Sequence, residues 1–285
     1  MRSSFIFRAR EKTVELGERT RLMGVVNVTP DSFFDGGRFL ERSQAIEHSL
    51  SLVEAGADIL DLGADSSRPG AESVPVGEEL DRLLPVLQEV RKRVCVPISV
   101  DTSKPAVARE ALKEGADIVN DITAFRCDPE MPRIVSEWDA GVVLTHMRGT
   151  PKTMQKRPFS ENILEEIQTD LQVAISKACQ NGIARERIII DPGIGFGKSL
   201  EDNCRILNRL SFLEGFRLPI LIGTSRKSFL GKMLDQPAAE RIWGTAASVV
   251  VAILRGVHIV RVHDVVEMNQ VARVTDVILA ESLLK

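Results

Sequence analysis

Eight short apolar runs rich in β-branched residues recur along this chain of 285 residues. We interpret these runs as strands, and they are Leu22–Asn27, Ile59–Leu62, Pro97–Asp101, Ile118–Asn120, Val142–His146, Ile188–Asp191, Ile220–Gly223 and Ile259–Val262. Their alternation with helical segments predicts a parallel sheet, because each crossover returns the chain to the same edge. Eight such units close into a barrel of about 250 residues more naturally than they form an open sheet. The sequence therefore predicts an α/β fold, a (β/α)8 TIM barrel formed by residues 1–285 as a single domain.

The segments between the predicted strands carry a helical pattern, with apolar residues at i, i+3 and i+4. The predicted helices include Ser43–Glu54, Val76–Lys92, Lys104–Glu114, Asn162–Asn181 and Gly244–Arg255. Glycine follows two of them, within Ala55–Asp58 and Glu114–Asp117, where it is expected to end the helix before the next strand. Residues Met1–Arg21 are predicted to add a short hairpin or arm under the barrel, with Gly17 in its turn.

The charge and cysteine content argue against several classes of protein. A formal net charge of −3 disfavours a nucleic acid or an anionic membrane as the main partner. The four cysteines form no Cys-x-x-Cys pair, so free thiols in a reducing cytosol are the simplest interpretation. The N-terminus lacks the apolar stretch of a signal peptide, and no segment reaches membrane-spanning length. We therefore expect a cytoplasmic protein that binds neither nucleic acid nor a membrane.

Polar residues stand at the end of each predicted strand or in the loop that follows it. In chain order they are Asn27; Asp61 and 65–70; Asp101; Asn120 and Asp121; His146; Asp191 and 192–197; 223–228; and 261–264. In a barrel these ends surround one mouth, where catalytic groups are found. Single residues have plainer explanations: an Asp can cap the next helix, His146 can be a satisfied core histidine, and Arg261 can pair with Asp264. The glycines of 193–197 resemble a phosphate loop, although glycine there can simply let the backbone turn. Because eight consecutive strands end this way, we interpret the mouth as a functional site.

The kinds of side chain at this mouth indicate its ligand. The carboxylates are Asp101 and Asp191, the amides are Asn27 and Asn120, and the cations are Arg68, Lys227, Arg261 and His263. Carboxylates and amides suit a nitrogen heterocycle, because a carboxylate accepts two parallel hydrogen bonds from an N–H/NH2 edge. The cations suit a phosphate or a diphosphate. Neither a Ser-His-Asp order nor a Cys–His pair is evident, so covalent acyl chemistry is not favoured. The residues predict a site for a nitrogen heterocycle joined to an anionic group.

Longer segments carry a resemblance to a known family. They read MGVVNVTPDSFFDGG, GADSSRPGAESV, PISVDTSKPAVA, ADIVNDITAF, LTHMRGTPKTMQ, IIDPGIGFGK, LIGTSRKSFLG and RIWGTAASVVVAILRGVHIVRVHDV. With these segments, from Met23 to about Asp264, the chain resembles the dihydropteroate synthases, folate-pathway enzymes that sulfonamides inhibit. The resemblance implies a transferase that joins p-aminobenzoate to (7,8-dihydropterin-6-yl)methyl diphosphate, releasing pyrophosphate and forming 7,8-dihydropteroate. It also implies Mg2+ as cofactor and a homodimer.

The resemblance assigns roles to residues by motif position. The pterin would contact Asp101, Asn120, Asp191, Lys227, Arg261, Phe196 and Gly223. The diphosphate would contact Ser67, Arg68, Arg261 and His263, with Asn27 holding Mg2+ on it. The p-aminobenzoate pocket would contain Phe33, Pro69 and Ser228. The expected catalytic residues are Asp35, Asp101, Asp191, Lys227 and Arg261.

A few positions depart from the family pattern. Ala64, Asp65 and Ser67 stand where Gly, Glu and Thr are usual, Thr145 replaces a Met under the pterin, and Phe34 replaces a Ser. None of these changes removes a catalytic group, so they bear on substrate affinity and sulfonamide response. The loops after the first two strands contain Pro and Gly, and we expect both to be lids that order over the diphosphate.

Two other functions stay open on the sequence. A pterin-binding methyltransferase module would share the barrel and the polar pterin edge, but it would not need the TPDSF, SRPG and SRKS segments found here. A non-catalytic relative would be expected to have lost polar groups at the strand ends, and they are present. A turnover assay separates these functions from the synthase.

Overall fold

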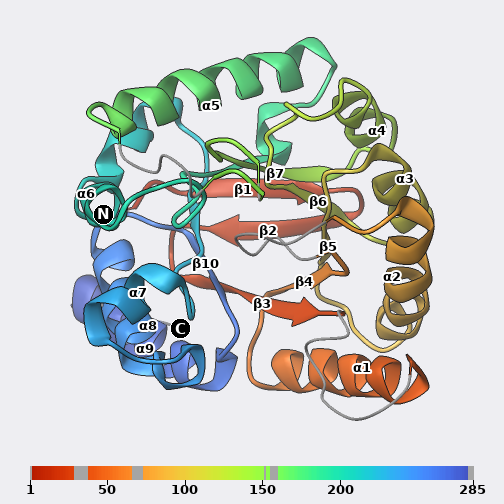
Figure 1. The fold of residues 1–285 in the computed structure, drawn as a ribbon, viewed down its shortest axis with the longest axis horizontal. Helices are drawn as coiled ribbons and strands as arrows, with labels where there is room; N and C mark the ends of the chain where they lie inside the picture. The colour runs from red at the N-terminus through yellow and green to blue at the C-terminus, as the bar shows by residue number, and fades with distance from the viewer. Residues whose placement is uncertain (1, 29–37, 66–72, 151, 155–159, 282–285) are drawn as a thin grey trace.

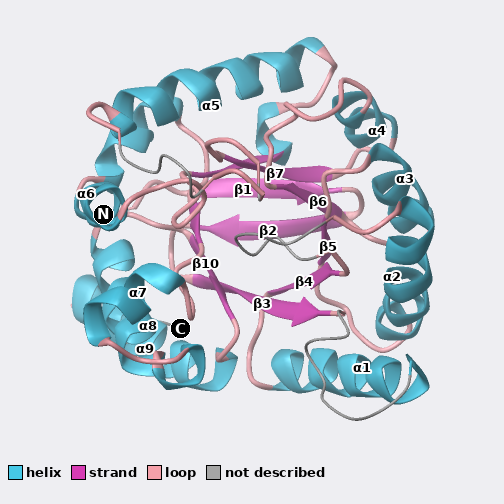
Figure 2. Ribbon diagram, viewed as in Figure 1, coloured by secondary structure: helices cyan, strands magenta, loops and turns pink. Residues whose placement is uncertain are grey.

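Parallel strands form the centre of the molecule, and helices surround them (Figures 1 and 2). The structure is a computed structural model that describes residues 2–28, 38–65, 73–150, 152–154 and 160–281. The strands of the barrel are β3 (Arg21–Asn27), β4 (Ile59–Gly63), β5 (Ile98–Asp101), β6 (Ile118–Asp121), β7 (Gly141–Thr145), β8 (Ile188–Asp191), β9 (Leu221–Ile222) and β10 (Ile259–Val262). They pair in parallel in the order β8-β7-β6-β5-β4-β3-β10-β9. A parallel bridge between Ile190 and Ile220 joins the two ends, so the prediction of a TIM barrel is confirmed.

The helices follow the strands in chain order and cover their outer face (Figure 2). They are α1 (Arg38–Glu54), α2 (Val76–Arg91), α3 (Pro105–Lys113), α4 (Met131–Glu137), α5 (Ile163–Gln180), α6 (Leu200–Asn208), α7 (Ser228–Leu234), α8 (Ile242–Leu254) and α9 (Val265–Ala280). Gly56 and Gly115 follow α1 and α3 with φ of +99° and +104°, as predicted for glycines that end a helix. Along the described part of the chain, no helix combines the length and the apolar character needed to cross a membrane.

An N-terminal hairpin closes the lower end of the barrel. Its strands are β1 (Phe5–Ala9) and β2 (Lys12–Leu16), paired antiparallel, which confirms the predicted hairpin. The prediction that Gly17 lies in its turn is wrong. The turn falls at Arg10, which has φ of +51°, whereas Gly17 follows β2 and packs where a Cβ would lie 2.7 Å from the Ser3 carbonyl oxygen. Phe7 also requires Gly141 on β7, because a Cβ there would meet its ring at 2.5 Å.

The barrel interior is arranged in layers, and this layering positions the site. The lower layer is apolar and packs on the hairpin; its members are Met23, Ile59, Ile118, Val143, Ile189, Leu221 and Ile259 with Phe7, Ala9, Val14 and Leu16. Side chains two residues apart on a strand share a face. The next inward positions are therefore Asp61, Asn120, Thr145, Asp191 and Arg261. A polar layer thus lies on an apolar floor at the carboxyl ends of the strands.

Candidate active site

Arg261 is held at the barrel mouth by two carboxylates from neighbouring strands. Its Nε donates to Asp61 Oδ2 at 2.6 Å, and its Nη2 donates to Asp101 Oδ2 at 2.9 Å. Two carboxylates on one guanidinium fix the plane of the group, which a single ion pair would leave free to turn. The pairing of Arg261 with Asp264 that the sequence allowed is wrong. Asp264 begins α9 on the outside and instead accepts from Arg226 Nε at 3.0 Å.

Asp61 is the centre of this arrangement, although only its position at a strand end was predicted from the sequence. It is fully buried, and its Oδ2 also accepts from Asn120 Nδ2 at 3.1 Å. The signal that could have found it is a charged residue within the apolar run Ile59–Leu62. Among the described residues, Asp61 Oδ1 and Asn120 Oδ1 are buried without a hydrogen-bond partner. Such acceptors suit the donor groups of a ligand.

The electrostatics of Asp101 place its ionisation near neutrality. Burial raises its pKa to about 7, and the negative charges of Asp61 and Glu79 add to this effect. The Arg261 guanidinium opposes them by favouring the carboxylate. The charge of Asp101 is therefore sensitive to pH in the physiological range.

Asp191 and Lys227 form the opposite side of the mouth. Asp191 Oδ1 accepts from the Gly193 N–H at 2.7 Å, and burial raises the pKa of its carboxyl. Lys227 Nζ donates to the Ile194 carbonyl and lies 4.4 Å from the centre of the Phe196 ring. Burial lowers the pKa of Lys227 to about 8, with Asp191 opposing the shift. A lysine that titrates this close to neutrality is typical of a functional site.

The glycines of 193–197 do not form a phosphate loop. Gly193, Gly195 and Gly197 all have positive φ, as a tight turn requires. The N–H of Gly193 is used by Asp191, and that of Gly195 donates to Asn203 Oδ1 at 2.7 Å. A Cβ on Gly193 would lie 1.9 Å from a backbone oxygen, so only glycine fits there. The alternative, that glycine lets the backbone turn, is the one the structure supports.

The remaining predicted residues lie around the rim or outside the described part of the chain. Asn27 ends β3, Gly223 follows β9, Ser228 begins α7, and His263 Nδ1 lies 3.0 Å from Ser225 Oγ. The predictions for Phe33, Phe34, Asp35, Ser67, Arg68 and Pro69, and for the two lids, fall outside the described residues. The structure thus gathers Asp101, Asn120, Asp191, Lys227, Arg261, Phe196 and Gly223 at one mouth, and their roles stay predictions.

Asp65, which stands where Glu is usual in the family, has an ion-pair partner that the sequence did not indicate. Asp65 Oδ2 lies 2.7 Å from Lys104 Nζ and accepts from Ser73 Oγ at 2.6 Å. Burial alone would raise the pKa of Asp65, but the bonds from Lys104 and Ser73 lower it below the ordinary value. Lys104 also pairs at 2.5 Å with Glu79, which is fully buried in α2. The side chain of Asp65, which is shorter than that of the usual Glu, is therefore held in place by Lys104 and Ser73.

Comparisons with known proteins identify the family to which the whole chain belongs. Residues 23–263 match the family model described as pterin binding enzyme. The dihydropteroate synthase of Synechocystis sp. is 45% identical over 91% of this chain and 90% of its own length, and that of Escherichia coli K12 is 44% identical over 91% and 92%. The chain belongs to the dihydropteroate synthase family. As a dihydropteroate synthase it is an enzyme, which confirms the predicted transferase over the methyltransferase module and the non-catalytic relative.

Solved dihydropteroate synthases share the whole fold. The Yersinia pestis enzyme with a sulfonamide drug complex has a TM-score of 0.91 at 39% identity, covering 97% of this chain and 100% of its own. The Xanthomonas albilineans enzyme with 4-aminobenzoic acid has the same TM-score and identity, covering 98% and 99%. The likeness thus extends over the N-terminal hairpin as well as the barrel.

Proposed function

We propose that this dihydropteroate synthase condenses p-aminobenzoate with (7,8-dihydropterin-6-yl)methyl diphosphate and releases pyrophosphate. The observation that carries the proposal is the polar layer of buried carboxylates, an amide and two cations on an apolar floor. The relative from Xanthomonas albilineans was solved with 4-aminobenzoic acid, and one from Coxiella burnetii was solved with pteroic acid. Both ligands agree with this substrate pair.

The pterin is recognised by side chains that include acceptor atoms without a protein hydrogen-bond partner among the described residues. The buried Oδ1 atoms of Asp61 and Asn120 lack protein partners within the described ranges, and both accept N–H groups. Asp191 accepts from the same kind of donor, and Lys227 donates to ring acceptors. Arg261, held flat by its two carboxylates, is suited to stack on the heterocycle.

The reaction breaks the C9–O bond of the diphosphate ester and forms a C9–N bond. The electron pair of the C–O bond leaves with the diphosphate, and the dihydropterin ring delocalises the cation that remains. Asp101 and Asp191 place negative charge near that cation, which is electrostatic stabilisation of charge that develops in the transition state. The amine lone pair of p-aminobenzoate then attacks C9, and the resulting ammonium loses one proton. Positioning of the amine replaces the need for a strong base.

The residues present fit a Mg2+ ion that arrives with the diphosphate. Asn27, half buried at the end of β3, would supply one amide oxygen. Mg2+ is commonly held by one or two protein oxygens together with substrate phosphates. Over the described ranges, no group of three or more His, Cys, Asp or Glu side chains is arranged to hold a metal ion by itself. When bound, Mg2+ would neutralise charge on the leaving group.

A pyrophosphate-release assay tests this function directly. Wild-type protein is expected to release pyrophosphate only when the dihydropterin diphosphate, p-aminobenzoate and Mg2+ are all present, and EDTA should stop release. Asp101→Asn should lower kcat by about 10²–10³-fold, because the carboxylate charge that faces the cation is lost. Asp139→Asn, at an exposed turn with φ of +51°, is the matched control and should retain wild-type rates. Well-folded wild type that binds the pterin tightly but releases no pyrophosphate would sink the synthase function in this chain.

The pKa shifts predict a narrow pH optimum. Activity should rise as pH increases through about 7, because Asp101 must be ionised, and fall as pH increases through about 8, because Lys227 must keep its proton. The measurement is kcat/KM for the diphosphate between roughly pH 5.5 and 9.5, which reports the free enzyme. Asp101→Asn should remove the acidic limb and Lys227→Met the alkaline limb. An acidic limb that persists in Asp101→Asn would assign that limb to another group.

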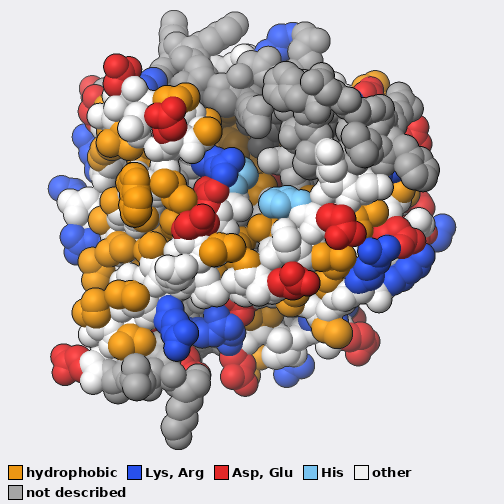
Figure 3. All heavy atoms as spheres, turned by 90° about the horizontal axis from the view of Figure 1, so that it is seen from below, with side chains coloured by type: hydrophobic (Ala, Val, Ile, Leu, Met, Phe, Trp, Pro, Cys, Tyr) orange, Lys and Arg blue, Asp and Glu red, His pale blue; other side chains and the backbone are white. Residues whose placement is uncertain are grey.

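We also propose that the chain acts as a cytoplasmic homodimer, with residues 1–285 as one domain. In Figure 3, hydrophobic side chains gather on the side where α8 and α9 lie in Figure 1. The Gly244–Val251 stretch is partly buried against its own barrel, at Thr245 and Val249. We therefore define the dimer surface by exposed apolar residues of α8 and α9, namely Trp243, Val251, Leu254, Val266, Val274 and Ile278. An apolar patch of this kind is typical of an interface.

A charge on this surface should separate the protomers. Ile278 is 68% exposed, and Ile278→Glu is expected to shift the protein from dimer to monomer, because a buried, unpaired carboxylate is costly at an interface. Light scattering after size-exclusion chromatography gives the mass. Val173→Glu on α5, which changes a residue that is 64% exposed, should leave the dimer unchanged. A wild-type monomer at micromolar concentration would contradict the proposal.

A further inference from the structure

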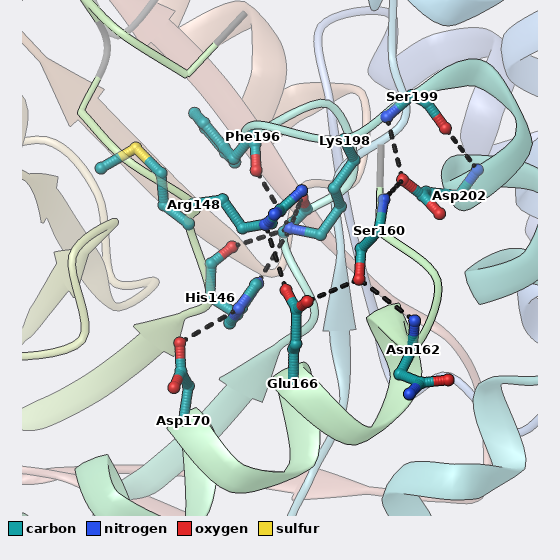
Figure 4. A network of polar contacts seen from close by, with 12 residues as sticks. His146, Arg148, Ser160, Asn162, Glu166, Asp170, Phe196, Lys198, Ser199 and Asp202 are labelled. Atoms are coloured by element: carbon teal, nitrogen blue, oxygen red, sulfur yellow. Dashed lines mark hydrogen bonds and ion pairs between the residues drawn. The ribbon is translucent and has the colours of Figure 1, made fainter. Parts of the chain in front are cut away.

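Lys198 is a buried lysine that the predicted site does not use. It precedes α6 and is only 3% exposed. Its Nζ lies 2.7 Å from the Gly193 carbonyl oxygen, 3.1 Å from that of Phe196, 3.1 Å from that of His146 and 3.0 Å from His146 Nδ1. All these contacts lie on two segments, His146 directly after β7 and the loop 193–197 (Figure 4). The amino group of Lys198 therefore ties the loop to the neighbouring strand, and its burial lowers the pKa of Lys198 well below the ordinary lysine value.

His146 extends this connection to α5. It is almost fully buried, and burial, aided by the charge of Lys198, lowers its pKa to about 4. The ring is therefore neutral, and Nδ1 serves as an acceptor for Lys198 while Nε2 carries the proton. Nε2 points to Asp170 Oδ2 at 3.3 Å (Figure 4). Within the described residues Nε2 makes no hydrogen bond of good geometry, so the hydrogen bond that fixes the ring is the one between Nδ1 and Lys198.

The backbone of Lys198 is anchored independently of the loop. Ser199 next to it forms a capping box with Asp202 at the start of α6. Asp202 Oδ2 also accepts from the Ser160 N–H at 3.2 Å, and Ser160 Oγ donates to Glu166 Oε1 at 2.5 Å (Figure 4). Because contacts with α6 and α5 anchor the chain next to Lys198, its side chain can hold the loop in place.

The loop that Lys198 holds determines where Lys227 lies. The Ile194 carbonyl accepts from Lys227 Nζ, and the Phe196 ring lies 4.4 Å from it. Lys198 binds two carbonyls of the same loop, those of Gly193 and Phe196. A Cβ at Gly195 would lie 3.2 Å from Lys227 Cδ, so the loop and the lysine side chain are in close contact. A change in the loop must therefore move Lys227.

We propose that Lys198 is a positioning residue for the pterin end of the site: it holds the loop 193–197 in the conformation that presents Lys227 to the ligand. Lys198 acts through the loop and is not expected to touch the substrate. The identity of the ligand rests on the proposed function, but the effect on Lys227 does not. The competing explanation is that Lys198 only satisfies buried carbonyls and adds stability.

The two explanations differ in what happens to Lys227 when Lys198 is replaced. The test is Lys198→Met in the full chain without substrate, with trace acetic anhydride labelling of Lys227 read by peptide mass spectrometry across the alkaline range. Lys227 faces Asp191, Asp101 and Arg261, which the substitution leaves in place, but it also couples directly to the charge of Lys198, so a moved midpoint supports the proposal only together with the KM change described below. Loosening of the loop admits water, so the labelling midpoint should move from about 8 towards the ordinary lysine value of about 10.4.

Kinetics give a second readout. KM for the dihydropterin diphosphate should rise about tenfold, which corresponds to about 1.4 kcal/mol, whereas KM for p-aminobenzoate should change by less than about twofold. Lys177→Met is the matched control, because it removes another lysine-to-carbonyl bond, from Nζ to the Phe125 carbonyl at 2.6 Å, at a different place. This control should leave the Lys227 midpoint at its wild-type value.

A positioning role and a purely structural role of Lys198 predict different results. A lower melting temperature with an unchanged Lys227 midpoint and an unchanged KM ratio would overturn the proposal in favour of a purely structural lysine. If Lys198→Met does not fold, Lys198→Gln decides by the same readouts, since its amide still donates to a carbonyl but cannot bridge both segments. Failure of wild type to release pyrophosphate would count against the proposed function alone, because the labelling of Lys227 needs no turnover.

Discussion

Asp61→Asn is expected to lower kcat/KM for the dihydropterin diphosphate by about 10²–10³-fold, a loss of about 3–4 kcal/mol in transition-state stabilisation. Asp61 fixes Arg261 and Asn120 through one carboxylate oxygen, so its replacement disturbs two predicted pterin contacts together. The same change should lower the pKa of Asp101 from about 7, because the negative charge of Asp61 helps to raise it. The acidic limb of the pH profile should therefore move to lower pH.

A matched control exists at the other end of the same strand. Asp58, just before β4, accepts from Arg21 Nη1 at 3.0 Å and from Arg19 Nη1 at 3.0 Å, at the lower end of the barrel. Asp58→Asn should leave both kcat/KM and the acidic limb unchanged, whatever its effect on stability. Steady-state kinetics on both variants across pH makes the comparison. Wild-type kinetics and an unmoved acidic limb in Asp61→Asn would show that the carboxylate serves the fold only.

The strand ends could be predicted from the sequence because the pattern is local. Asp101 and Asp191 each close an apolar run, and side chains two residues apart share a face, so both were expected at the mouth. No role in the site was predicted for Asp61, because its partner Arg261 is 200 residues away in the sequence. Nothing in a strand pattern says which inward side chain meets which across the barrel. The alternative explanation of Arg261, an ion pair with Asp264, fails for the related reason that Arg261 points inward and Asp264 precedes an outer helix.

The glycine-rich segment shows a second limit of sequence interpretation. Three glycines at alternate positions are compatible with a phosphate loop and with a tight turn. The choice depends on which way the backbone groups point. Here the carbonyls of Gly193 and Phe196 bind Lys198, and the Gly193 N–H binds Asp191. Lys198, directly after the glycines, binds these carbonyls and helps to fix their orientation. Its burial could not be predicted from the sequence, because a lysine in a loop is usually exposed.

Asp276→Ala is expected to lower the free energy of unfolding by about 3–5 kcal/mol, the loss typical of one partner removed from a buried ion pair. Asp276 on α9 is 3% exposed and pairs with Arg2, and it accepts from the Thr20 N–H at 2.6 Å and Thr20 Oγ1 at 2.9 Å. Arg2 Nη1 also donates to the Val257 carbonyl at 3.0 Å. The substitution would leave a buried guanidinium without its counter-charge and release the N-terminal segment from the last helix.

Urea unfolding measures the loss, and a double-mutant cycle with Arg2→Ala assigns it. Because the two residues share one interaction, the double variant should lose clearly less than the sum of the single losses. Glu137→Ala, which removes an exposed pair with Arg109 at 3.1 Å, is the control and should cost no more than about 1 kcal/mol. Folded Asp276→Ala should keep its turnover, since this cluster lies below the apolar floor and the site lies above it. Strict additivity in the cycle, or a loss as small as that of Glu137→Ala, would contradict the role of this buried pair.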